Sequence, residues 1–173
     1  MIQSEFSHIA VIGAGTMGSG IAAQIANAGL PVLLLDLPAK DAGMPAPAEA
    51  AIQKLIRSDP PQLMSRDNAQ LITAGTIDGD FHQLSKCDLI IEAVIEQLPV
   101  KQALYRRLDE TVSADCVITS NTSTIPISLL VEGMPNSFAK RFAITHYFNP
   151  VRFMRLLELV RGAHTDAGIM DRL

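Results

Sequence analysis

The chain has 173 residues and a mass of 18.6 kDa, the size of a single α/β domain with a buried core. Its 48% hydrophobic and 18% charged residues exclude an intrinsically disordered chain, because enough apolar surface is present to offset the entropy lost on folding. The formal net charge of −4 and the lack of a basic run argue against nucleic acid as a partner.

The first predicted elements are a strand, a helix and a second strand. Residues 9–12 form an unbroken apolar run that ends at glycines, which is typical of a central strand buried on both faces. Small and apolar residues recur at helical spacing over residues 17–28, and Gly29 is suited to end that helix. Residues 31–36 repeat the buried-strand pattern. Together these segments predict a βαβ unit with two parallel strands.

A pair of helices is predicted next. Residues 37–47 contain three prolines and a glycine, which predict a loop. Apolar spacing then predicts a short helix over residues 48–56, stopped by the prolines at 60–61, and a second helical stretch from about residue 63 to 72. This segment would form a helical hairpin between two strands.

Strands and helices alternate through the rest of the chain. The predicted strands cover residues 88–94, 117–120, 142–145 and 155–160, and the predicted helices cover residues 100–112 and 127–131. The alternation predicts a doubly wound α/β fold of the Rossmann type, with a mostly parallel sheet and the helical hairpin inserted after the second strand.

The cysteines and the N-terminus indicate a reducing compartment. Cys87 and Cys116 have no CxxC spacing and no companion histidines, so we expect neither a disulfide framework nor a metal site, and we interpret both as core residues. No lysine or arginine precedes Lys40, unlike a signal peptide, and no apolar run reaches the roughly 18 residues of a membrane span. We therefore expect a cytoplasmic protein that does not bind membranes.

The clearest motif is Gly13-Ala14-Gly15-Thr16-Met17-Gly18, a GxGxxG pattern between the first strand and its helix. Glycines there allow a tight turn and let backbone N–H groups approach a pyrophosphate at the helix N-terminus. Asp36, at the end of the second strand, can accept the hydroxyls of an adenosine ribose and would repel a 2′-phosphate. The pattern predicts a dinucleotide, with NAD preferred over NADP; no second flavin signature supports FAD.

A histidine and a glutamate are candidates for proton transfer. His146-Tyr147-Phe148-Asn149-Pro150 directly follows a predicted strand, and Glu158 lies 12 residues after His146. An imidazole can take a hydroxyl proton while a carboxylate on its other nitrogen fixes the tautomer. Taken alone, the same residues favour a structural interpretation, a histidine at the edge of the core and an exposed glutamate.

Polar residues also follow two other predicted strands. The run Ser120-Asn121-Thr122-Ser123-Thr124 falls at the carboxyl edge of the sheet, where ligands bind in such folds, although an ordinary turn or helix cap would have the same composition. Glu92, Glu96 and Lys101 could contact a ligand or form a surface ion pair, and the sequence alone favours the ion pair.

The combination of four motifs resembles the NAD-binding domain of 3-hydroxyacyl-CoA dehydrogenases, over nearly the whole chain. The motifs are the GxGxxG segment with its continuation to Ala22, the segment Ile91-Glu92-Ala93-Val94-Ile95-Glu96, the segment Ser120-Asn121-Thr122-Ser123, and the segment His146-Tyr147-Phe148-Asn149-Pro150. The resemblance is strongest to the large bacterial fatty-acid oxidation members, in which a hydratase-like region can follow. Tyr147 stands where family members usually have Phe.

The resemblance implies a role for each motif residue. His146 would be the general base, Glu158 its orienting partner, and Ser123 and Asn149 would hold the substrate's 3-oxygen, with Ser123 also on the nicotinamide side. The implied cofactor residues are Gly13, Gly15, Thr16, Met17 and Gly18 at the pyrophosphate, Asp36 at the ribose, and Ala93, Glu96 and Lys101 at other parts of NAD. The implied reaction is oxidation of an L-3-hydroxyacyl-CoA to a 3-ketoacyl-CoA in fatty-acid β-oxidation.

The family resemblance also implies a second, helical domain after residue 173, with dimer contacts and the other wall of the acyl-CoA cleft. We therefore expect residues 1–173 to be a fragment that binds NAD but turns over substrate slowly, and the longer protein to be a homodimer. Two alternatives stay open. One is a 3-hydroxyisobutyrate or 6-phosphogluconate type dehydrogenase, which relies on a catalytic lysine; the other is a dinucleotide-binding homologue without catalysis.

Overall fold

Seven strands form one sheet in the computed structural model, which describes residues 5–173. The strands are β1 (Ile9–Ile12), β2 (Val32–Asp36), β3 (Ile72–Thr76), β4 (Leu89–Glu92), β5 (Val117–Ser120), β6 (Phe142–Tyr147) and β7 (Leu157–Arg161). Their order is β3-β2-β1-β4-β5-β6-β7. Neighbouring strands from β3 to β6 are parallel, and β7 runs antiparallel to β6. The predicted doubly wound, mostly parallel sheet is therefore confirmed.

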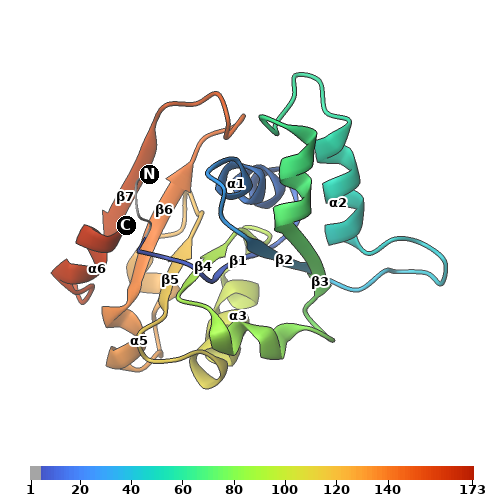
Figure 1. Cartoon of the computed structure of the whole chain (residues 1–173). Coiled ribbons are helices and arrows are strands. Elements are labelled where there is room, and N and C mark those ends of the chain that lie inside the picture. The colour runs from blue at the N-terminus through green and yellow to red at the C-terminus, as the bar shows by residue number, and fades with distance from the viewer. Residues whose placement is uncertain (1–4) are drawn as a thin grey trace.

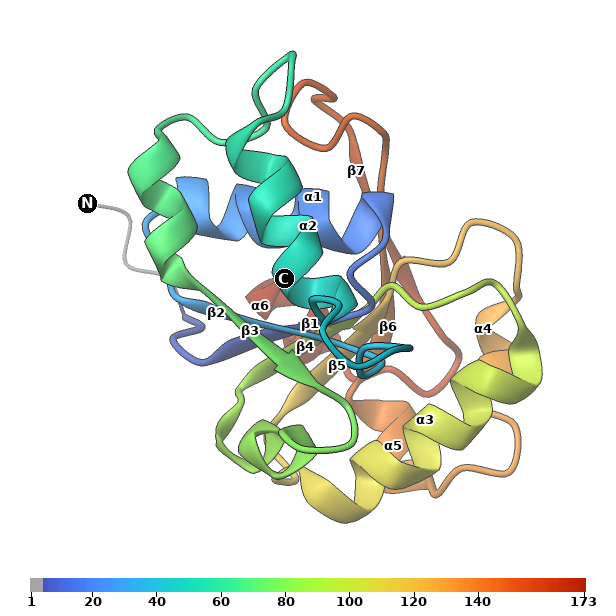
Figure 2. The same ribbon diagram turned by 90° about the vertical axis from the view of Figure 1, so that its right-hand side faces the viewer.

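Helices cover both faces of the sheet (Figures 1 and 2). They are α1 (Thr16–Asn27), α2 (Pro47–Ile56), α3 (Leu98–Thr111), α4 (Ile127–Leu130), α5 (Asn136–Lys140) and α6 (Ala167–Arg172), with 3-10 helices η1 (Arg66–Leu71) and η2 (Phe81–Lys86). Helices α1 and α2 lie on one face, and α3, α4 and α5 lie on the other (Figures 1 and 2). Among the described residues, no helix is long and apolar enough to cross a membrane.

Strand β1 shows why the central strands are continuously apolar. Its side chains alternate between the faces, so Ile9 and Val11 pack in the core beneath α1 and α2, while Ala10 and Ile12 pack in the core beneath α3. All four residues are buried. A strand with a helix layer on each side has no solvent-facing position, which is the pattern that the sequence predicted.

The prediction of a helical hairpin is correct only for its first helix. Helix α2 forms as expected, but residues 66–71 are a short 3-10 helix, and Ile72 already begins β3. This strand was not predicted, because its sequence Ile-Thr-Ala-Gly-Thr has one buried apolar residue and no run of them. As the outer neighbour of β2, it joins the sheet by backbone pairing, and Ile72 alone adds a buried side chain to the core beneath α1 and α2.

The end of the sheet also differs from expectation. Strand β6 continues through His146 and Tyr147, which the sequence placed after it, because β7 pairs with these residues in antiparallel register. All five residues of β7 are exposed, although three of them are apolar. The strand predicted over residues 155–160 is therefore present as an exposed strand at the edge of the sheet.

Both cysteines are free and buried, as predicted. Burial raises the pKa of the Cys87 thiol to about 11 and that of Cys116 to about 12. Below those values the thiols stay protonated, so at pH 8 only about one Cys87 in a thousand is the reactive thiolate. We expect Ellman's reagent to leave both thiols unmodified in the native chain and to titrate two after unfolding in guanidinium. Rapid modification of the native chain would contradict this burial.

Candidate active site

The candidate site lies at the carboxyl edge of the parallel strands, between β1 and β4. Strands β2 and β3 follow β1 on one side of the sheet, and β4 begins the series on the other side. The chain leaves β1 at Gly13, whose N–H donates to Leu35 O at 2.7 Å. It leaves β4 at Ala93, whose N–H donates to Ile12 O at 2.8 Å. The first loop then turns into α1 on one face and the second continues toward α3 on the other, which leaves a crevice between them.

Two glycines of the Gly13–Gly18 motif have different roles, Gly15 just before α1 and Gly18 in its first turn. A Cβ on Gly18 would lie 1.7 Å from Gly13 O, so this position requires glycine for the loop to pack against α1. A Cβ on Gly15 would meet nothing within 4 Å, so the space in front of Gly15 is open. Helix α1 has no side-chain cap and no acidic residue in its first turn among the described residues. Its N-terminus is therefore suited to an anion.

Asp36 stands beside this loop at the end of β2. Its Oδ2 accepts the Ala14 N–H at 2.5 Å, and its Oδ1 accepts the Leu37 N–H at 2.6 Å. With Gly13 and Gly15 it lines a cavity of about 440 Å³ whose other lining is mainly aliphatic. The arrangement offers a carboxylate for hydroxyl groups next to an apolar surface for a flat ring.

A second cavity, of about 410 Å³, lies across the Ala93–Val94 segment, which lines both cavities. Besides Ala93, its lining includes five more of the predicted site residues: Met17, Glu96, Ser123, His146 and Asn149. Two larger cavities of about 530 and 900 Å³ lie elsewhere in the described chain and contain none of the predicted residues. The two cavities that meet at Ala93 are thus where the sequence motifs converge.

His146 and Glu158 face each other across the β6–β7 pair, where their Cα atoms are register partners. His146 Nδ1 lies 2.9 Å from Glu158 Oε2. Because a carboxylate only accepts hydrogen bonds, Nδ1 carries the proton of this bond, and in the neutral imidazole the lone pair is then on Nε2. The histidine side chain is 19% exposed and the glutamate 51% exposed. The antiparallel pairing thus explains why a spacing of 12 residues brings the two side chains together.

Asn121 is a site residue to which the sequence assigned no role. Its Oδ1 accepts the Tyr147 N–H at 2.9 Å, and its own N–H donates to Glu92 O at 2.7 Å. It also lines the cavity that contains His146. Because the backbone pairing of β5 with β6 ends at Ser120, the amide extends that pairing and fixes the end of β6. The sequence feature that could have identified Asn121 as a site residue is its place in the polar run after β5.

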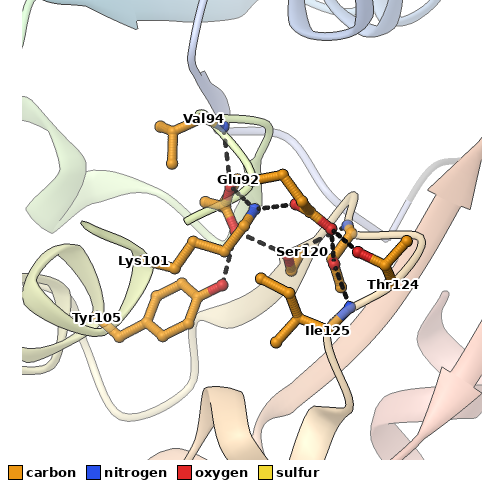
Figure 3. A network of polar contacts seen from close by, with 9 residues as sticks. Glu92, Val94, Lys101, Tyr105, Ser120, Thr124 and Ile125 are labelled. Atoms are coloured by element: carbon orange, nitrogen blue, oxygen red, sulfur yellow. Dashed lines mark hydrogen bonds and ion pairs between the residues drawn. The ribbon is translucent and has the colours of Figure 1, made fainter. Parts of the chain in front are cut away.

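The prediction of a surface ion pair among Glu92, Glu96 and Lys101 is wrong. Glu92 is fully buried and Lys101 is 1% exposed, and their charged atoms lie 2.6 Å apart (Figure 3). The ammonium also lies 3.1 Å from Glu96 Oε2. Although partial burial opposes ionisation of Glu96, the hydrogen bond from Thr122 and the Lys101 charge keep its pKa below the ordinary value.

The remaining predicted residues take varied positions. Thr16 is exposed at the start of α1, and Gly18 is buried behind the loop. Lys101 lies beneath Glu96 and lines neither of the two cavities, so the structure places it behind a predicted cofactor residue. Glu158 also lies outside both linings and reaches the site through the His146 ring.

The chain matches a known family over nearly its whole length. The family model for the NAD-binding domain of 3-hydroxyacyl-CoA dehydrogenase matches residues 8–173. A Rickettsia felis relative, named as a trifunctional enzyme of a fatty acid oxidation complex, is 40% identical over 99% of this chain and 24% of its own length. A Deinococcus radiodurans relative named "Probable 3-hydroxyacyl-CoA dehydrogenase" is also 40% identical, over 93% of this chain and 47% of its own length.

The fold has close counterparts among solved structures. The crystal structure of 3-hydroxybutyryl-CoA dehydrogenase from Escherichia coli K12 superposes with a TM-score of 0.82 at 33% identity. The match covers 97% of this chain and 35% of that one. The chain therefore spans about a quarter to a half of the length of the curated relatives it matches.

Proposed function

The chain belongs to the family of NAD-binding domains of 3-hydroxyacyl-CoA dehydrogenases, and from this premise we propose that it oxidises an L-3-hydroxyacyl-CoA to the 3-ketoacyl-CoA with NAD. The observation that carries the proposal is the junction of the two cavities at Ala93. One contains the glycine loop and Asp36, and the other contains His146 and Ser123.

The residues present fit NAD as the cofactor. The open space in front of Gly15 and the uncapped N-terminus of α1 suit a pyrophosphate, and Asp36 suits the hydroxyls of a ribose. Met17 and Glu96 would then lie on the nicotinamide side, in the cavity of His146. When bound, NAD accepts a hydride from the carbon that is oxidised.

His146 supplies the proton chemistry in this proposal. Its Nε2 takes the proton of the substrate's 3-hydroxyl group, while a hydride leaves the carbon that bears this hydroxyl group. Glu158 holds Nδ1–H and stabilises the imidazolium that forms, because a charge-assisted hydrogen bond is stronger than a neutral one. Ser123 and Asn149, exposed in the same cavity, would orient the 3-oxygen.

The test of the proposal is a comparison of substrates. The chain is mixed with NAD and either an L-3-hydroxyacyl-CoA, the free 3-hydroxy acid or 6-phosphogluconate, and formation of NADH is followed by absorbance. We expect slow turnover of the acyl-CoA only, because part of the substrate-binding surface is expected to lie outside residues 1–173. Equal turnover of the free acids would favour the lysine-dependent class, and binding of NAD without any turnover in the full-length protein would favour a non-catalytic homologue.

Substituting Gly15 tests the cofactor position alone. Its φ of −65° suits any residue, and an added methyl group meets no protein atom. We therefore expect Gly15→Ala to keep the melting temperature within about 2 °C of the wild type. The methyl group would occupy the space assigned to the pyrophosphate, so the Kd for NADH should rise about tenfold or more in a fluorescence titration. Unchanged affinity would place the cofactor elsewhere.

The proposal includes the cellular setting. Two buried free cysteines fit a reducing compartment, which supports the cytoplasm as its location. Acyl-CoA is the proposed partner, and the homodimer expected for the longer protein stays a prediction.

A further inference from the structure

The Glu92 carboxylate lies wholly inside the fold and has no capacity left for a ligand. Its Oε1 accepts the Val94 N–H at 2.8 Å and the Lys101 ammonium at 2.6 Å. Its Oε2 accepts the hydroxyl groups of Tyr105 and Ser120, each at 2.6 Å (Figure 3). These four donors fill the four lone-pair sites of a carboxylate. Glu92 therefore acts only through other residues.

Packing of the sheet does not account for a charge at this position. The other residues of β4 are Leu, Ile and Ile, all buried, and a further apolar residue would continue the core. Removing a carboxylate and an ammonium from water costs several kcal/mol per ion, and a buried ion pair is seldom more stabilising than an apolar replacement. The position of Glu92 is better explained by what the pair contacts.

Lys101 links Glu92 to the wall of the cavity. Its ammonium also contacts Glu96 Oε2 at 3.1 Å. The other oxygen of Glu96 accepts hydrogen bonds from the hydroxyl groups of Thr122 and Thr124. Three donors thus occupy a carboxylate that can accept four, so one lone-pair site of Glu96 is left for a further donor, and Glu96 lines the cavity. Glu96 is 39% exposed, unlike the residues behind it.

Resting on the proposed function, we propose that Glu92 is a positioning residue for the nicotinamide half of the cofactor. By pairing with Lys101 inside the fold, Glu92 keeps the ammonium from forming a closer ion pair with Glu96. The Glu96 carboxylate is then fixed at the cavity wall, with its charge and its open lone pair available to a hydroxyl group of the dinucleotide. The cavity of Asp36 contains none of these side chains, so the adenosine half binds independently of them.

A double-mutant cycle between Glu92 and Glu96 tests this role. Glutamine at position 92 keeps the shape and can still bond to Val94, Tyr105 and Ser120, so Glu92→Gln changes mainly the charge that holds Lys101. We expect this variant to raise the Kd for NADH about fivefold, and the Kd for ADP by less than about twofold, in fluorescence and calorimetric titrations. In the Glu96→Gln background, Glu92→Gln should change the Kd for NADH by less than about twofold.

Asp109→Asn is the matched control, because Asp109 lies near the other end of α3 and pairs with the buried Arg141 at 2.8 Å. It should lower the melting temperature and leave both dissociation constants unchanged. If Glu92→Gln does not fold, Tyr105→Phe removes one donor to Glu92 and should raise the Kd for NADH about fourfold, with the Kd for ADP changed by less than about twofold.

Three outcomes would overturn the inference. They are unchanged NADH affinity in the position 92 and 105 variants, an equal loss of affinity for NADH and ADP, and additive effects of the two glutamate substitutions. A wild-type chain that binds neither ligand would instead contradict the proposed function, so the two failures are distinguishable.

Discussion

Replacing His146 by Gln is expected to lower the rate of NADH formation from an L-3-hydroxyacyl-CoA about a thousandfold, because glutamine cannot accept the hydroxyl proton. The affinity for NADH should stay within about twofold of the wild type, since the side chain is not assigned to cofactor binding. The rate is measured by absorbance under single-turnover conditions, and the Kd by fluorescence.

Glu158→Gln is the graded comparison for that result. The amide can still lie opposite His146 in the β6–β7 register, but it carries no charge to stabilise the imidazolium. We therefore expect a smaller loss of rate than for His146→Gln, again with unchanged NADH affinity. A wild-type rate for the His146→Gln variant would show that the imidazole is not the general base.

Gly18→Ala is expected to destabilise the fold itself. The added methyl group would lie 1.7 Å from the carbonyl oxygen of Gly13, and that oxygen belongs to backbone that cannot move without opening the loop. We expect a loss of about 3 kcal/mol or more, which corresponds to a fall of roughly 6–12 °C in melting temperature for a domain of this size. Thermal unfolding followed by circular dichroism measures it.

Gly15→Ala serves as the control for that measurement. The two glycines belong to one motif, yet only Gly15 faces open space. We therefore expect Gly18→Ala to lower the melting temperature. We expect Gly15→Ala to lower the affinity for NADH and to leave the melting temperature unchanged. Equal melting temperatures for both variants would show that the loop does not pack against α1 as described.

The parts of the fold that could be predicted are those encoded by local patterns. The buried strand at residues 9–12 and the glycine motif after it are specified by neighbouring residues, because a strand covered on both faces must be apolar throughout. The same holds for the position of His146 near the carboxyl edge. The family resemblance then assigned roles that spacing alone left open.

The parts that could not be predicted depend on partners distant in the sequence. Strand β3 is held by its pairing with β2 and has little apolar signal of its own. The burial of Lys101 depends on Tyr105 and Ser120 filling the other side of Glu92, which no local pattern shows. The extension of β6 through His146 requires β7, whose antiparallel direction is a property of the whole sheet.

A crystal structure of the chain with NADH tests the central claim most directly. We predict that the dinucleotide crosses the Gly13–Gly18 loop, with its ribose at Asp36 and its nicotinamide ring in the cavity of His146, facing Nε2. A coenzyme bound elsewhere on the chain, or a nicotinamide ring directed away from His146, would contradict the account.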